Sequence, residues 1–161
     1  MFDINDFEDE AVWDLICDGQ TKGVFQLESS LGKHWAKQVK PRNIKELAAL
    51  ISLIRPGCLK ATDASGKSMA QVYVDRKANK EPVTYPDDAL KEVLSETYGV
   101  LVYQEQSMKI AQKLAGFDLK EADALRKAIG KKKAGLMEKV KKTFLKGTAK
   151  EGIVTTEVAE E

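Results

Sequence analysis

Residues 98–133 read YGVLVYQEQSMKIAQKLAGFDLKEADALRKAIGKKK, and this stretch decides the fold that the sequence predicts. Its apolar run at 100–103 is β-branched and aromatic, and it is too short to form a helix of its own. Three polar residues follow, and then small and apolar residues recur at helical spacing: Met108, Ala111, Leu114 and Ala115. Gly116 is placed to end this helix, because glycine adopts the left-handed conformation at a helix C-terminus without strain.

A second helix is predicted directly after Gly116. Asp118 is a favourable N-cap, and Glu121, three residues later, completes a capping box. The side predicted to be buried consists of Leu119, Ala122, Leu125 and Ile129. The remaining surface is cationic and leads into a basic run, with Lys120, Arg126, Lys127, Lys131, Lys132 and Lys133. The pattern therefore predicts a packed helix pair that carries dense positive charge at one end.

Length and composition indicate an ordinary globular protein with one hydrophobic core. The chain has 161 residues, of which 43% are hydrophobic and 32% are charged. No apolar run approaches the ~20 residues of a membrane span, and the acidic N-terminus does not resemble a signal peptide. Two distant cysteines, Cys17 and Cys58, and one histidine, His34, argue against a zinc site. We therefore expect a reduced, cytoplasmic setting and no membrane association.

The net charge of +1 conceals a strong asymmetry along the chain. Residues 1–29 hold eight acidic residues and one basic residue, a net charge of −7. Residues 109–150 hold thirteen basic residues and four acidic ones, a net charge of +9. A basic half of this density indicates a polyanionic partner, and a solvated lysine-rich helix surface explains it equally well.

The remaining chain is predicted to be mainly α, a multi-helix fold with one or two short strands or extended segments. Helices are expected at residues 7–17, 30–39, 43–55, 68–79 and 88–96. Leu136, Val140 and Phe144, at four-residue spacing, mark another helix that ends near Gly147 or Gly152, and a further helix is expected from Thr155 or Thr156. A short half-buried strand is expected at 23–29, a turn at Pro56-Gly57, and a loop at 59–67.

Two of these helices have predicted buried sides. In the first helix that side is Phe7, Ala11, Val12 and Leu15. In the helix from Asn43 the main stripe is Ile44, Leu47, Ala48, Ile51 and Ile54, with Leu50 and Leu53 as a second stripe. Apolar residues on both sides predict that this helix is deeply buried.

Motifs for catalysis are weak. Gly66-Lys67-Ser68 would need a glycine at position 61 to form a phosphate-binding loop, and that position is Ala61, so a phosphate-loop kinase is disfavoured. Neither Asp3, Asp6 and Asp9 nor Asp118 and Asp123 form a convincing metal-binding set. We therefore expect no catalytic residues and no metal site in this chain.

Four stretches resemble successive motifs of the bacterial replicative DNA polymerase III alpha subunit, a C-family DNA polymerase. They are GVFQLES at 23–29, RPG at 55–57, YGVLVYQEQ at 98–106 and LRKAIGKKK at 125–133. They occur in the family's order and at about its spacing, and the resemblance covers nearly the whole chain. It implies that residues 1–161 are a single fragment of the polymerase fingers region, with a truncated C-terminal helix and without the palm.

The resemblance also implies a role in DNA-directed DNA synthesis. The fingers would hold the incoming deoxynucleoside triphosphate with Arg126 and Lys127, helped by Lys131 and Lys133 and more weakly by Arg55. Gln104, Glu105 and Gln106 would shape the nucleotide side of the fingers or brace the helix end. The implied partners are primer-template DNA, the nucleotide, the palm and thumb of the parent chain, and other replisome subunits. Mg²⁺ would lie in the palm, so the fragment alone would be inactive.

The chain departs from the family pattern in four ways. Cys58 stands where the family usually has a proline, and the segment 59–70 is not close to the usual sequence. Lys127 stands where the family commonly has a second arginine, so one bidentate contact to phosphate is lost. The acidic palm motif is absent from these residues. A free-standing helical nucleic-acid-binding module remains the alternative interpretation.

Overall fold

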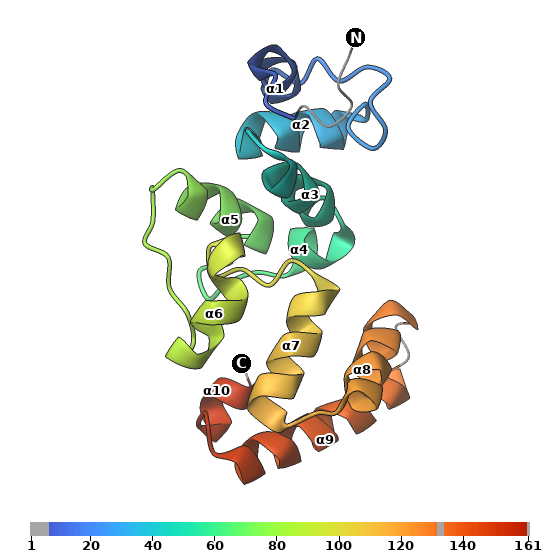
Figure 1. The fold of residues 1–161 in the computed structure, drawn as a ribbon, viewed down its shortest axis with the longest axis vertical. Coiled ribbons are helices and arrows are strands. Elements are labelled where there is room, and N and C mark those ends of the chain that lie inside the picture. Colours follow the sequence, from blue (N-terminus) through green and yellow to red (C-terminus); the bar gives the residue numbers. More distant parts are fainter. Residues whose placement is uncertain (1–6, 132–133, 161) are drawn as a thin grey trace. The chain divides into compact units, whose positions relative to one another are not determined.

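The computed structural model describes residues 7–131 and 134–160, without the side chains of Lys131 and Ala134. This part of the chain is mainly helical, with ten α-helices and two short 3-10 helices, as the sequence predicts (Figure 1). It divides into two compact units, residues 1–82 and residues 83–161. None of the described helices has the length and hydrophobicity needed to cross a membrane.

The first unit contains five helices whose starts are set by local capping. They are α1 (Glu10–Cys17), α2 (Ser30–Val39), α3 (Ile44–Leu53), α4 (Pro56–Lys60) and α5 (Met69–Lys77). Ser29 and Asn43 accept hydrogen bonds from backbone N–H groups of the first turns of α2 and α3, so these helices begin close to the residues that the sequence predicts. Asp9 does the same for α1, so this helix begins at Glu10 and not at residue 7.

The predicted buried side of α1 is wrong, and in α3 only the second predicted stripe is confirmed, so α3 is not deeply buried all round. The buried residues of α1 are Trp13, Ile16 and Cys17, whereas Phe7, Val12 and Leu15 are exposed. In α3 the predicted second stripe is the buried one, with Ala49, Leu50 and Leu53, while Ile44 is 46% exposed and Ile51 is half-buried. Both helices are apolar on more than one side, so neighbouring helices decide which side is covered: α2 contacts both, and α4 also contacts α3.

Two loop predictions also need correction. The expected strand at 23–29 is a series of turns that leaves Phe25 82% exposed and buries Leu27. The turns pack onto α2 at Gly32, where an added Cβ would lie 2.6 Å from the carbonyl oxygen of Gln26. Pro56 begins α4 instead of a turn, because proline is well suited to the first position of a helix.

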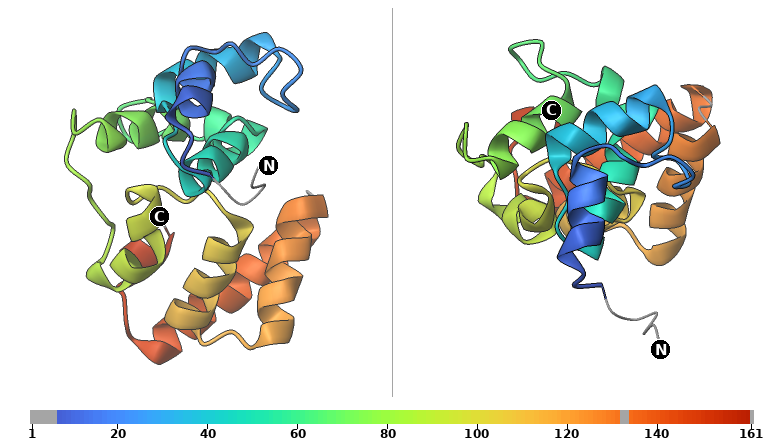
Figure 2. Two further views of the ribbon diagram at one scale, coloured as in Figure 1. Left: turned by 45° about the horizontal axis from the view of Figure 1, so that its top comes forward. Right: turned by 90° about the horizontal axis from the view of Figure 1, so that it is seen from above.

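The second unit begins with a helical run and continues into three longer helices. The run comprises η1 (Asp88–Leu90), α6 (Lys91–Leu94) and η2 (Ser95–Thr97), close to the helix expected at 88–96. The others are α7 (Gln104–Ala115), α8 (Leu119–Lys131), α9 (Ala134–Glu151) and the short α10 (Thr156–Glu160). Helices α7, α8 and α9 pack against one another, as the additional views show (Figure 2).

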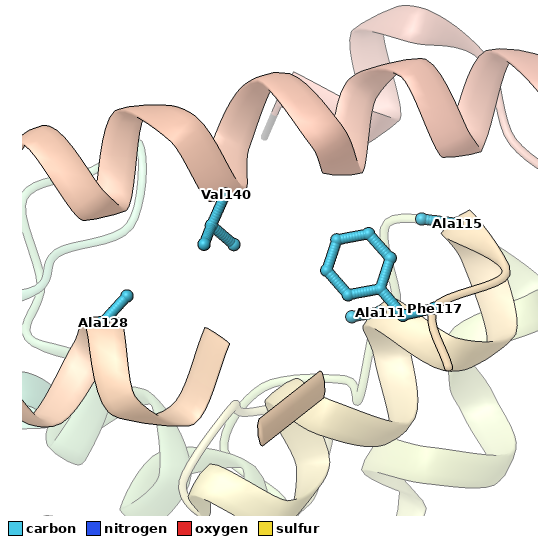
Figure 3. Packing of buried hydrophobic residues seen from close by; sticks show 5 residues of the cluster. All are labelled: Ala111, Ala115, Phe117, Ala128 and Val140. Carbon is cyan, nitrogen blue, oxygen red and sulfur yellow. The ribbon is translucent and has the colours of Figure 1, made fainter. Parts of the chain in front are cut away.

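A small core lies between α7, α8 and α9. It contains Ala111, Ala115, Phe117, Ala128 and Val140 (Figure 3). Leu125, Leu136 and Phe144 pack around it. The predicted inner side of α7 is largely confirmed, because Ala111, Leu114 and Ala115 are buried. On α8 the prediction holds for Ala122 but is wrong for Leu119, which is 76% exposed. The fully buried Ala128 takes part in the core instead.

Helix α9 approaches the end of α7 at Gly147. A Cβ added to Gly147 would lie 2.2 Å from the carbonyl oxygen of Ala115, a distance that no atom pair of this kind tolerates. Of the two helix ends that the sequence allows, Gly147 is not the one observed. The helix continues to Glu151, and Gly152 follows it with a φ of 65°. Gly116, with a φ of 64°, ends α7 as the sequence predicts.

We expect Gly147→Ala to destabilise the protein, although alanine favours helix by about 1 kcal/mol over glycine. The added methyl would force α7 and α9 apart, at a cost of about 1–3 kcal/mol beyond that gain. The matched control is Gly135→Ala on the same helix, where an added Cβ meets nothing within 4 Å. Thermal unfolding should show a lower midpoint for Gly147→Ala only. Equal midpoints for the two variants would contradict the close approach.

Candidate functional site

The start of α8 is fixed by the predicted capping box. Oδ1 of Asp118 accepts a hydrogen bond from the backbone N–H of Glu121 at 2.8 Å, and Oε2 of Glu121 accepts one from the backbone N–H of Asp118 at 3.0 Å. Ala122 and Ala128 are completely buried, which fixes the rotation of the helix about its axis. The cap and these two alanines together determine which residues of α8 face solvent.

Arg126 and Lys127 lie on the solvent side of α8. Their side chains are 43% and 56% exposed, so burial does not hold them. Both are paired with Asp123, one turn earlier. Nε and Nη2 of Arg126 lie 3.0 and 2.8 Å from Oδ1 of Asp123, and Nζ of Lys127 lies 2.6 Å from Oδ2. The ion pairs with Lys127 and Arg126 lower the pKa of Asp123, so the carboxylate is charged at neutral pH.

The sequence motifs alone did not identify Asp123 as part of this group. The signal was present in the spacing, because residues at i+3 and i+4 are neighbours on a helix surface. Across residues 7–131 and 134–160 no group of three or more His, Cys, Asp or Glu residues is placed to hold a metal ion.

The sequence also predicts Lys131, Lys133 and Arg55 as phosphate-binding residues, and they are not among the described ion-pair partners of Asp123. Lys131 is the last residue of α8, and its side chain is not described; Lys133 lies outside the described residues. Arg55 belongs to the first unit, where it is exposed and precedes α4. It lines a groove of about 460 Å³, together with Phe25, Gln26, Glu28, Ser29, Ile51, Ile54 and Pro56.

The triplet at the start of α7 divides into two roles. Gln104 and Glu105 are exposed, whereas Gln106 is 6% exposed and fully hydrogen-bonded. Oε1 of Gln106 accepts hydrogen bonds from the backbone N–H groups of Val102 and Tyr103, both at 2.9 Å. Its Nε2 donates to the carbonyl oxygen of Val93 at 3.2 Å and to Oγ1 of Thr97 at 2.8 Å. Gln106 therefore braces the start of α7 against the preceding helical run.

Thr97 completes this brace, and sequence reasoning missed it. It is completely buried, and its hydroxyl donates a hydrogen bond to the carbonyl oxygen of Val100 at 2.6 Å while accepting one from Gln106. The turn between them needs two left-handed residues, Tyr98 with a φ of 53° and Gly99 with a φ of 77°. The N–H groups of Tyr98, Gly99 and Val100 donate to backbone carbonyl oxygens of residues 94–97, and the Thr97 hydroxyl adds the bond to the Val100 carbonyl. No periodic pattern could reveal this arrangement.

A row of lysines follows one flank of α9. Its members, separated by three or four residues, are Lys139, Lys142, Lys146 and Lys150, and all are exposed. Lys142 is paired with Glu138 at 2.8 Å. Lys139, Lys146 and Lys150 form no ion pair within the part of the chain that the structure describes. This flank, named here the α9 lysine row, is a concentrated and largely uncompensated positive surface.

Lys67 of the Gly66-Lys67-Ser68 sequence is already bound to two carboxylates. Its Nζ lies 2.9 Å from Oδ2 of Asp75 and 2.8 Å from Oε2 of Glu81. Ser68 caps α5 by accepting a hydrogen bond from the backbone N–H of Gln71. These bonds give the loop a structural role and leave its lysine poorly suited to bind phosphate.

Comparison with known proteins identifies one family. Residues 2–152 match the family model of the bacterial DNA polymerase III alpha subunit finger domain. Curated relatives named DNA polymerase III subunit alpha include those of Aquifex aeolicus, 48% identical over 145 residues, Escherichia coli K12, 40% over 151, and Bacillus subtilis, 38% over 144. The matches cover 90%, 91% and 89% of this chain, which spans only 12% of the length of each relative.

We expect Gln106→Leu to lower the free energy of unfolding by about 2–4 kcal/mol, because it leaves largely buried backbone groups without partners. Gln104→Leu is the matched control, since Gln104 is exposed on the same helical turn and should change stability by less than ~0.5 kcal/mol. Urea unfolding of both variants measures the difference. The bracing role of Gln106 would be refuted by variants of equal stability.

Proposed function

The chain belongs to the bacterial DNA polymerase III alpha subunit finger domain family, and from this premise we propose that it positions the incoming deoxynucleoside triphosphate and the primer-template DNA during replication. The proposed reaction of the full-length polymerase is template-directed transfer of a nucleotide to a primer 3′-hydroxyl. This chain would contribute positioning, and Mg²⁺ would act at acidic residues of the palm. DNA replication would place the protein in the bacterial cytoplasm.

The observation that carries the proposal is the cation pair on α8. Arg126 and Lys127 are adjacent, solvent-facing and attached to a helix whose rotation is fixed by the buried Ala122 and Ala128. A guanidinium and an ammonium offer several N–H donors to the oxygens of a triphosphate, and charge-assisted hydrogen bonds of this kind are the strong ones. Lys131, Lys133 and Arg55 remain secondary candidates for the same ligand.

The α9 lysine row supports the DNA part of the proposal. Eleven residues separate Lys139 from Lys150, which corresponds to about 16 Å along a helix. Positive charge spread over this length suits a phosphate backbone better than a single compact anion. The row and the cation pair on α8 therefore serve different parts of the same substrate complex in our proposal.

Family membership favours the polymerase over a free-standing nucleic-acid-binding module, and the ion pairs of Lys67 disfavour a phosphate-loop kinase. The chain spans 12% of its relatives' length. We therefore also propose that it contacts the palm and thumb of the full-length polymerase and other replisome subunits. Gln104 and Glu105, which are exposed beside the brace, are proposed to face the nucleotide side of the fingers.

In the full-length polymerase, Arg126→Ala should raise the nucleotide KM and lower kcat/KM by about ten- to a hundredfold, the effect of losing a charge-assisted contact of ~1.5–3 kcal/mol. The affinity for primer-template DNA should change little. Lys120→Ala, which removes an exposed charge from the same helix, is the control. Unchanged nucleotide kinetics, or a defect confined to DNA binding, would overturn the assignment.

Replacing Lys139, Lys146 and Lys150 with alanine should weaken DNA binding and reduce its dependence on salt. Each lost phosphate contact lowers the slope of log affinity against log salt by about 0.7–0.9, so the triple variant should lose about 2–3 units. The nucleotide KM at saturating DNA should be unchanged. Alanine at Lys22, Lys37 and Lys60, exposed in the first unit, removes equal charge as a control. Equal slopes for the two triple variants would exclude the α9 lysine row.

A further inference from the structure

The carboxylate of Asp123 binds Arg126 along one edge only. Oδ1 accepts hydrogen bonds from Nε at 3.0 Å and from Nη2 at 2.8 Å, and Oδ2 is occupied by Nζ of Lys127 at 2.6 Å. One carboxylate thus orients two adjacent cations of α8, Arg126 and Lys127. The i+3 and i+4 spacing makes this arrangement a property of the helix itself, independent of any other element.

The contacts leave the other edge of the guanidinium available. Arginine has five N–H donors in a fixed planar fork, and the bonds to Asp123 use the one on Nε and one on Nη2. One donor of Nη1 and the second donor of Nη2 form the Nη1–Nη2 edge, and the other donor of Nη1 points back toward Cδ. This edge has the geometry that binds two oxygens of a carboxylate or a phosphate at once.

We propose that Asp123 is a positioning residue for the triphosphate: it holds the Nε edge of Arg126 and thereby presents the Nη1–Nη2 edge to phosphate oxygens. The inference rests on the proposed function, in which Arg126 binds the nucleotide. Asp123 does not touch the ligand and acts through Arg126. It also holds the ammonium of Lys127 beside the guanidinium, so that two donors of different shape face one ligand.

The two ion pairs of Asp123 add little to the folding stability of the protein. The side chains of Asp123, Arg126 and Lys127 are 37%, 43% and 56% exposed, and exposed ion pairs contribute little to folding. The larger effect of these ion pairs is that they order the side chains of Arg126 and Lys127. Arginine and lysine lose much rotamer freedom when they bind a ligand, and a side chain that is ordered beforehand loses less.

The negative charge of Asp123 also opposes a phosphate ligand, so the two effects have opposite signs. The repulsion acts across an exposed surface, where water and salt screen it. The orientation of the fork is not screened. The geometry therefore points to a net gain from Asp123, and the sign of the change in KM decides between positioning and competition.

The test is single-nucleotide incorporation by the full-length polymerase carrying Asp123→Ala. The nucleotide KM should rise by roughly three- to tenfold, with little change in kcat, DNA affinity or thermal midpoint. Asp123→Glu, which keeps the carboxylate, should restore most of the loss. Asp123→Asn, which can accept from Arg126 but not hold Lys127 by charge, should lie between alanine and the parent protein. A lower KM for Asp123→Ala would make Asp123 a competitor and overturn the proposal.

A double-mutant cycle with Arg126→Ala separates this inference from the proposed function. If Asp123 acts through Arg126, Asp123→Ala should add little once Arg126 is alanine. An equal rise in KM in both backgrounds would overturn the positioning role and leave the nucleotide assignment of Arg126 intact. Failure of Arg126→Ala alone to raise KM would overturn both. A lowered thermal midpoint in Asp123→Ala that accounts for the kinetic loss would make the residue structural.

Discussion

The contact between the Ala115 carbonyl and Gly147 is the constraint on which the second unit depends. It brings the backbones of α7 and α9 closer than any side chain would allow. Phe117, Val140 and the fully buried Ala128 belong to the same hydrophobic core as Ala115. Because Ala128 lies on α8, the same packing fixes the rotation of the helix that carries the candidate phosphate-binding residues.

Two groups of polar side-chain interactions act together with this packing. At the start of α7, the amide of Gln106 accepts from the backbone N–H groups of Val102 and Tyr103, and the hydroxyl of Thr97 donates to the carbonyl oxygen of Val100. On α8, Asp123 orients two exposed cations that the core cannot reach. Buried networks of the first kind specify a conformation, whereas exposed pairs of the second kind contribute little stability and mainly set direction.

The basic half of the chain contains two different kinds of positively charged surface. Arg126 and Lys127 are compensated by Asp123 and form a compact, oriented pair. The α9 lysine row is extended, and only Lys142 within it has an acidic partner among the described residues. Net charge along the sequence shows neither distinction, because both depend on which side of a helix each residue occupies.

The sequence by itself determined the mainly helical fold and the family. It also determined the helix boundaries at Ser29, Asn43, Asp118 and Gly116, because a cap acts between residues only a few positions apart. It also pointed to Arg126 and Lys127. The tertiary structure alone decided which sides of α1 and α3 are buried, that Leu119 faces solvent, and that α9 continues through Gly147. These features depend on neighbouring elements far along the chain, and a periodic pattern with apolar residues on two sides carries no information about which neighbour will cover it.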